Sequence, residues 1–248
     1  MINFGPLTMA IQHSEPEWMI CNQWSATTES DTLMISATAT ITKETLPILE
    51  NSERFVLGKT GESVLLKPAL ADRPVIIKPR EPFNLAPGAE TKLYVSSPLW
   101  ISISVGSPSV QLKETPIIRP SDTWFGPSTL EGMLCYASKT HGYLHCDELP
   151  MRMHRAVTPV KIVNDAESTF LLERFSLPAP HLKLFCDSES KFLWTQPLTL
   201  IREKDEATAS LKLEEGPPSE ALNAIQIGNP RVEPDKSALT RALDTLFG

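Results

Sequence analysis

The residues best suited to chemistry gather in one stretch, SDTWFGPSTLEGMLCYASKTHGYLHCDELP, from Ser121 to Pro150. It holds two cysteines, two histidines and four carboxylates, which are the side chains of metal sites and cysteine nucleophiles. His141 and His145 are four residues apart, a spacing that suits paired zinc ligands on a helix. The expected structure here is a hairpin with His141 in its turn, so the metal signal is weak and no cofactor is predicted.

The turn of that hairpin decides which side chains share a face. In KTHG, a type I turn followed by Gly142 predicts a three-residue loop. Because neighbouring residues of a strand alternate between faces, this register places Cys135, His145 and Asp147 on one face. These three side chains are the candidate group for a cysteine- or metal-dependent hydrolase.

A two-residue loop would change the register and the chemistry. It would place Cys135 directly opposite Cys146. It requires positive φ at Thr140 and His141, which is unfavourable for residues other than glycine. The three-residue loop is therefore preferred, although both remain open.

Packing in a sheet is the favoured interpretation of this stretch, because cysteine is among the residues most often buried. Nothing in the sequence indicates an oxyanion hole or a substrate pocket. The dinucleotide-binding, P-loop, nucleophile-elbow and zinc-protease patterns are missing. An enzyme is therefore not favoured, and the Cys135–His145–Asp147 hydrolase stays as an alternative.

Tryptophans suggest a second alternative. Trp18 and Trp24 are six residues apart, so they share one face if their segment is a strand. Trp100 lies opposite the apolar face of the strand LWISISVG. An exposed face of this kind could bind a small ligand or a carbohydrate.

Charge and hydropathy exclude several classes of partner. The formal net charge is -7, and no cluster of lysine and arginine appears, so we expect no nucleic-acid binding. No apolar run approaches the ~18 residues that a membrane span needs. The first residues lack the basic and apolar regions of a secretory signal. We therefore expect a cytoplasmic protein whose four cysteines are thiols.

Proline and strand periodicity predict an all-β fold. The chain has 22 prolines, ten of them between Pro68 and Pro127, and a proline inside a helix costs about 3 kcal/mol. Short segments with a two-residue period recur about every ten residues. We expect two β-sandwich or barrel-like units packed together, covering residues 1–120 and 121–218. One elongated sandwich is the structural alternative.

Residues 219–248 form a C-terminal extension. Its end, EPDKSALTRALDTLFG, predicts an amphipathic helix at about 235–247, with Leu239, Leu243 and Leu246 on one face. A helix this short needs a surface to pack against. That surface is either the chain's own β-structure or an interface with a second copy or a protein partner.

Several longer phrases resemble a known family. They are RPVIIKPREPFNLAPG, with Pro79–Pro82 and Phe83–Pro87, then DTWFGPSTLEGMLCYAS, with Trp124–Gly126 and Leu134–Tyr136, and the V-x-I-x-N run that ends at Asn164. Together they resemble an uncharacterised archaeal and bacterial family, domain of unknown function four-three-two, over roughly Pro74 to Leu213. The resemblance implies a β-rich fold and carries no activity or catalytic residues.

The leading hypothesis is a non-enzymatic, cytosolic interaction or scaffold protein. Its support is the β-rich chain, the terminal amphipathic helix and the lack of a recognisable catalytic motif. The partner is expected to be another protein or a second copy of the chain.

Overall fold

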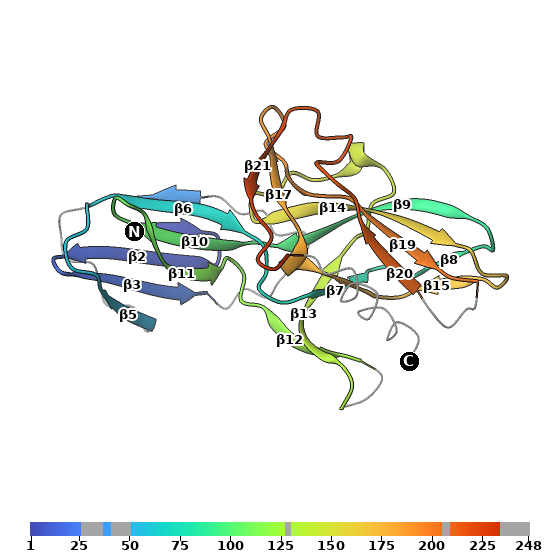
Figure 1. The fold of residues 1–248 in the computed structure, drawn as a ribbon, viewed down its shortest axis with the longest axis horizontal. Coiled ribbons are helices and arrows are strands. Elements are labelled where there is room, and N and C mark those ends of the chain that lie inside the picture. Colours follow the sequence, from blue (N-terminus) through green and yellow to red (C-terminus); the bar gives the residue numbers. More distant parts are fainter. Residues whose placement is uncertain (26–36, 41–50, 127–129, 205–208, 234–248) are drawn as a thin grey trace. The chain divides into compact units, whose positions relative to one another are not determined.

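The computed structural model describes residues 1–25, 37–40, 51–126, 130–204 and 209–233. The chain divides into two units. Unit 1 holds residues 1–69 and 99–119, and unit 2 holds residues 70–98 and the chain from residue 120 onward. The predicted all-β fold is confirmed: the described elements are 21 strands and two short 3-10 helices (Figure 1).

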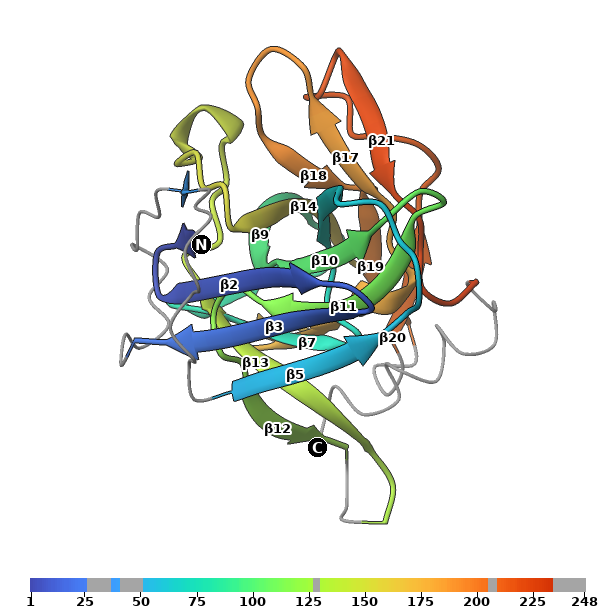
Figure 2. The same ribbon diagram turned by 90° about the vertical axis from the view of Figure 1, so that its left-hand side faces the viewer.

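The described residues of unit 1 form two antiparallel sheets. The first has the strand order β4-β1-β2-β3-β5, with β1 Ile2–Phe4, β2 Leu7–Ser14, β3 Glu17–Trp24, β4 Ala37–Ala39 and β5 Asn51–Val56. The second has the order β11-β10-β6, with β6 Val64–Ala69, β10 Trp100–Val105 and β11 Val110–Pro116. Figure 2 shows β2, β3 and β5 side by side.

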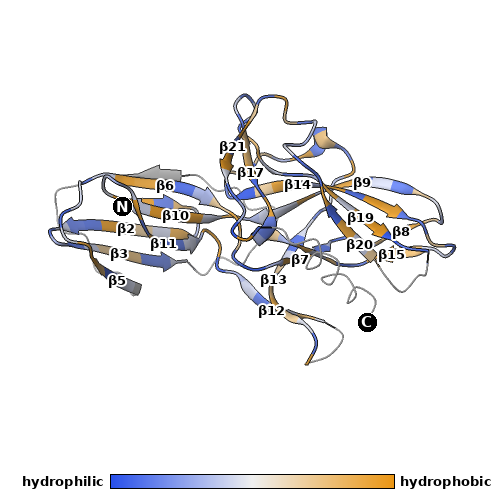
Figure 3. Ribbon diagram, in the orientation of Figure 1, coloured by the Kyte–Doolittle hydropathy of each residue, from blue (hydrophilic) through white to orange (hydrophobic). Residues whose placement is uncertain are grey.

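Side chains join the two sheets of unit 1. The amide of buried Asn22 on β3 donates to Thr115 Oγ1 on β11 at 3.0 Å. The indole of Trp24 donates to the carbonyl of Pro116 at 3.1 Å. The aliphatic residues of LWISISVG are buried as predicted, and Ser102 and Ser104 between them are partly exposed, but Trp100 on the same face as these serines is buried too. The change of hydropathy along the strands is visible in Figure 3. The buried side chains of this unit include Leu7, Met9, Ile20, Leu99, Ile101, Ile103 and Val105.

In unit 2, the strands that the structure describes form three sheets. One has the order β12-β13-β7-β16, with β7 Val75–Pro79, β12 Ser121–Phe125, β13 Met133–Thr140 and β16 Phe175–Leu177. The largest has the order β20-β19-β14-β18-β17-β21, with β9 also paired to β14; its strands are β9 Glu90–Pro98, β14 Arg155–Asn164, β17 Leu184–Asp187, β18 Leu193–Thr195, β19 Leu198–Arg202, β20 Ala209–Leu213 and β21 Ala224–Gly228. The third pairs β8 Phe83–Leu85 with β15 Phe170–Leu172. The 3-10 helices are η1 Cys146–Glu148 and η2 Ala179–His181.

The central strand of the largest sheet is β14. It pairs antiparallel with β9 and parallel with β18 and β19. Its first six residues are all buried, as expected for a strand that is covered on both faces. At its end, Asn164 is fully buried and holds the loop after β8.

The division of the chain and its C-terminal helix are two features that the sequence predicts. Residues 70–98, assigned from the sequence to the first domain, lie in unit 2. The division at residues 120 and 218 into separate domains stays a prediction. The helix expected at about 235–247, with Leu239, Leu243 and Leu246, lies outside the described residues.

Candidate functional site

The stretch from Ser121 to Pro150 does not form the predicted hairpin. β13 continues to Thr140, which is buried and pairs with Pro79 of β7. The antiparallel partner of β13 is β12, which precedes it in the chain. The predicted registers around the KTHG loop are therefore wrong. The physical reason is that β7 and β12 occupy both edges of β13, so the residues after Gly142 cannot pair with it.

The surroundings of Cys135 consequently do not fit the nucleophile or metal-ligand role that the sequence suggested. It faces Thr123 of β12 instead of Asp147. Its side chain is fully buried against Phe125 and Ile76. Burial raises the pKa of the Cys135 thiol to about 11, so it stays protonated at neutral pH. A protonated, buried thiol is a poor nucleophile and a poor metal ligand.

The other two members of the candidate group lie outside any strand. His145 precedes the 3-10 helix η1, and Asp147 lies within η1. The shared sheet face that joined them to Cys135 in the prediction therefore does not form. Within the described ranges, no group of three or more His, Cys, Asp or Glu side chains is arranged to hold a metal ion.

A second titratable group does assemble in unit 2, around Glu220. Its carboxylate accepts hydrogen bonds from Lys92 and, at 2.5 Å, from the hydroxyl of Tyr94. Desolvation raises the pKa of Glu220, but these two hydrogen bonds outweigh it and lower the pKa to about 2. Burial, followed by the bond to Glu220, raises the pKa of Tyr94. Burial also raises the pKa of nearby Cys146.

These shifts move all three groups away from the range in which a general acid or base works. At pH 7 Glu220 stays a carboxylate, whereas Tyr94 and Cys146 stay protonated. An efficient general acid–base group has a pKa near the working pH. The hydrogen bonds from Lys92 and Tyr94 to Glu220 therefore fit a structural role.

The indoles proposed for ligand binding are engaged inside unit 1. Trp18 is 2% exposed, stacks on His13 and donates to Thr60 Oγ1 at 2.7 Å. Trp100 is 4% exposed. Trp24 is partly buried and donates to a backbone carbonyl. Neither Trp18 nor Trp100 thus presents a ring face to solvent.

Hollows among the described residues of unit 2 include a small one and an open groove. One, beside buried Arg155, has a volume of about 10 Å³, which suits one water molecule. The other is an open groove of about 490 Å³ over β9, β14 and β19. Its polar side chains pair with each other or with neighbours: Lys161 with Glu90 at 2.8 Å, and Thr199 with Glu214 at 2.8 Å.

The exposed face of the β12–β13 hairpin is a different kind of site. Trp124 of β12 lies directly opposite Leu134 of β13, and both remain exposed, at 46% and 45%. Leu130, on the same hairpin, is 94% exposed. We call this surface the hairpin face and define it by the side chains of Arg73, Asp122, Trp124, Leu134 and Tyr136, with Leu130 in the adjoining segment between the two strands.

Register explains why the hairpin face projects. β7 pairs with β13 from Tyr136 to Thr140, whereas β12 pairs with it from Met133 to Ala137. The outer part of the hairpin is therefore only two strands wide. Figures 1 and 2 both show it extending from the other strands of its unit. Its opposite face is buried through Phe125 and Cys135.

Two glycines permit the close approach of the strands at the outer end. A side-chain carbon at Gly126 would lie 2.2 Å from the carbonyl oxygen of Glu131. One at Gly132 would lie 2.7 Å from the indole nitrogen of Trp124. Any larger residue would push the strands or the indole aside. These glycines therefore fix where Trp124 lies on the hairpin face.

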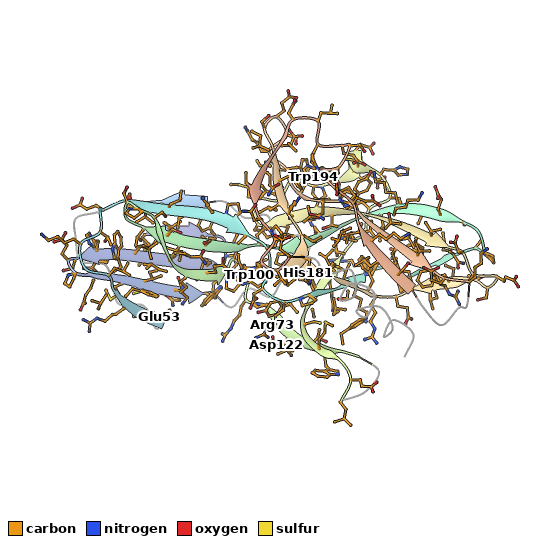
Figure 4. All side chains as sticks on the ribbon, viewed as in Figure 1. Glu53, Arg73, Trp100, Asp122, His181 and Trp194 are labelled. Carbon is orange, nitrogen blue, oxygen red and sulfur yellow. The ribbon has the colours of Figure 1, made fainter. Side chains whose placement is uncertain are left out.

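A polar network forms the inner end of the hairpin face. Arg73 pairs with Asp122 at 3.3 Å and lies over the ring of Tyr136 at 5.2 Å; Figure 4 shows Arg73 and Asp122 next to each other. The hydroxyl of Tyr136 donates to Asp72 at 2.9 Å. Burial, then this bond, raises the pKa of Tyr136 to about 12. The hairpin face thus combines tryptophan, tyrosine and arginine, the residues enriched at interaction hot spots.

Sequence reasoning missed this surface. The prediction used this stretch for its cysteines and histidines, and the ligand-binding alternative rested on Trp18, Trp24 and Trp100 instead of Trp124. The available signal was the pair of glycines around WFG and GML, which closes a hairpin between DTWF and MLCY. That pairing aligns Trp124 with Leu134 and leaves both on the face opposite Phe125 and Cys135.

Fold and site together define an all-β protein whose β12–β13 hairpin carries an exposed apolar face. A family model described as a protein of unknown function, DUF432, matches residues 1–247, so the chain belongs to that family. The suspected resemblance is thereby confirmed. No curated protein and no solved structure matches the chain. Among the described residues no helix is long and apolar enough to cross a membrane.

Proposed function

We propose that the protein is a non-enzymatic interaction protein that binds a short amphipathic helix of a protein partner on the hairpin face. The observation that carries this proposal is the directly opposed pair Trp124 and Leu134, exposed with Leu130 on one projecting hairpin. Exposed apolar side chains that gather on one surface typically mark an interaction site.

The shape of the hairpin face favours a helix over a strand. Side chains stand perpendicular to a sheet, so a strand added at the edge of β12 would leave Trp124 and Leu134 uncovered. Two paired strands make a strip about 10 Å wide, and the five residues of β12 span roughly 17 Å. A helix is about 10 Å across, and three turns of it are roughly 16 Å long.

Energetics indicate a contact that depends on the partner's own apolar side chains. Full burial of a large apolar side chain contributes about 2 kcal/mol, and Trp124 and Leu134 are each about half buried already. Covering them together with Leu130 would contribute on the order of 4 kcal/mol. Association itself costs about 4 kcal/mol or more. A leucine-bearing face on the partner must supply the remainder.

The titratable groups support the non-enzymatic part of the proposal. Burial keeps Cys135 protonated, and the Glu220 group titrates far from neutral pH. We place the protein in the cytoplasm as part of the same proposal. All four cysteines are free thiols, as a reducing compartment favours.

Photo-crosslinking tests this function. A benzophenone side chain introduced at Leu134 should crosslink, in cells that make the protein natively, to an amphipathic helix of another protein. Mass spectrometry of the crosslinked peptide identifies that segment. The matched control is Leu171, a leucine of the same unit that is 49% exposed. Equal yields at both positions, or a yield at Leu134 that survives Trp124→Ala, would overturn the proposal.

A further inference from the structure

The described chain ends close to the hairpin face. Arg231 donates to the carbonyl of Leu70 at 3.0 Å through Nε and at 2.5 Å through Nη2. The backbone nitrogens of Arg231 and Val232 both donate to the carbonyl of Pro180, at 2.8 and 3.1 Å. These bonds fix the chain in unit 2 immediately before residue 234.

A short loop connects this anchor to the hairpin face. Leu70 is three residues before Arg73, a span of at most ~10 Å. Arg73 itself belongs to the hairpin face through Asp122 and Tyr136. One end of this loop, Leu70, bonds to Arg231 near the end of the described chain. Its other end, Arg73, belongs to the inner end of the hairpin face.

The segment that follows has the chemistry that the hairpin face requires. Its sequence predicts a helix at about 235–247 with Leu239, Leu243 and Leu246 along one side. Thirteen helical residues extend about 20 Å, enough to run along the roughly 17 Å of β12. The segment is too short to be a stable helix without a surface to cover its leucines.

We infer that this segment of the same chain occupies the hairpin face in the absence of a partner, so that a partner helix must displace it. The inference rests on the proposed function, since both helices use the same surface. Attachment through a short linker gives the segment an effective concentration of the order of 1 mM. If the free peptide binds with a Kd of ~100 μM, the attached segment would then occupy the hairpin face in about ten molecules for each molecule in which the face is open.

Titration of the free segment tests the inference. The probe is a fluorescein-labelled peptide of residues 234–248, and the acceptor is the chain truncated after Glu233. We expect saturable binding by fluorescence anisotropy. Trp124→Ala combined with Leu134→Ala in the acceptor should weaken it at least tenfold, as should Leu243→Asp in the peptide. Leu171→Ala is the matched control and should leave the Kd unchanged.

Measurements on the intact chain distinguish a segment that occupies the hairpin face of its own molecule from a segment that occupies the face of a second copy. It should bind the labelled peptide about tenfold more weakly than the truncated chain and sediment as a monomer. Absence of peptide binding by the truncated chain, or equal binding by both chains, would overturn the inference. A concentration-dependent dimer that disappears on truncation would assign the segment to a second copy and would overturn it as well.

The two experiments fail independently. A Leu134 crosslink to a helix of another protein, without peptide binding by the truncated chain, retains the proposed function and removes this inference. Peptide binding by the truncated chain, without a Leu134 crosslink above the Leu171 control, retains the inference that the C-terminal segment occupies the hairpin face. The same result removes the proposed binding of a partner helix.

Discussion

Asn164 offers the most direct check on how unit 2 is held together. Its side chain is fully buried, and its amide nitrogen donates to the carbonyls of Leu85, Ala86 and Ser168 at 3.0, 3.1 and 2.9 Å. Its side-chain oxygen accepts from the nitrogen of Ala166 at 3.3 Å. One side chain thus joins the end of β14 to the loop after β8.

Replacement by alanine removes these bonds and leaves their backbone partners unsatisfied. The two amide hydrogens are shared among the three carbonyls, so with the bond from Ala166 the side chain makes the equivalent of about three hydrogen bonds. A net contribution of about 1 kcal/mol per hydrogen bond gives a loss near 3 kcal/mol for Asn164→Ala. In a chain of this size, each 1 kcal/mol lowers the Tm by about 3 °C, so we expect a fall of about 10 °C. Calorimetry and urea denaturation measure the two quantities.

The control is Asn84→Ala, an exposed asparagine on strand β8 of the same region. A surface change of this kind should alter stability by less than about 0.5 kcal/mol. Equal, small losses for Asn164→Ala and Asn84→Ala would refute the structural role of the Asn164 amide.

A change of charge at residue 164 tests whether this position requires a hydrogen-bond donor. Asn164→Asp places an acceptor-only carboxylate against three carbonyl oxygens. Burial and these oxygens raise the pKa of that carboxyl in the folded state above its unfolded value of ~3.9. The variant should therefore lose progressively more stability as pH rises above ~4, and its deficit relative to wild type should be smaller at pH 4 than at pH 7.

Three further predictions follow from the hairpin and the Glu220 group. The pKa of Glu220 is lowered to about 2, so its bonds stabilise the protein above pH ~4.5 and are lost as pH falls towards 2; Glu220→Gln should remove that part of the acid dependence in urea titrations between pH 2 and 7. Cys135 should react with Ellman's reagent at least tenfold more slowly than Cys146 in the folded protein, because burial and a pKa of about 11 suppress its thiolate, and denaturant should remove the difference. Gly132→Ala should displace the Trp124 indole and shift tryptophan emission, whereas an unchanged spectrum and stability would contradict the close approach of the two residues.

Local patterns predicted the strands well, because the alternation of apolar and polar residues is a local property. LWISISVG has its alternate aliphatic residues buried, and the all-β class follows from proline content. Pairing is a different matter, since it depends on residues distant in sequence. Strands β5 and β6 are neighbours in the chain, yet β5 pairs with β3 and β6 pairs with β10.

The same limit explains the candidate site. Cys135 and His145 were placed on one face through a local turn at Gly142. The parallel partner of β13 is β7, more than fifty residues earlier, and no local pattern reveals it. Trp18 likewise finds its hydrogen-bond partner at Thr60, 42 residues away. Sequence could therefore identify which residues form strands, but not which side chains those strands bring together.

Folding alone does not account for the outward side chains of the β12–β13 hairpin. The buried side of the hairpin, through Phe125 and Cys135, already fixes its register. A cross-strand pair such as Trp124 and Leu134 contributes roughly 0.2–1 kcal/mol, and threonine pairs are favourable at such positions too. Threonine would fit the pleated surface without exposing a large apolar area to solvent. Two large apolar residues directly opposite each other on a two-stranded ribbon therefore add little to stability and increase the risk of aggregation. An apolar surface that adds little stability and increases the risk of aggregation is explained when another chain segment covers it. The peptide titration therefore bears on function as well as on structure.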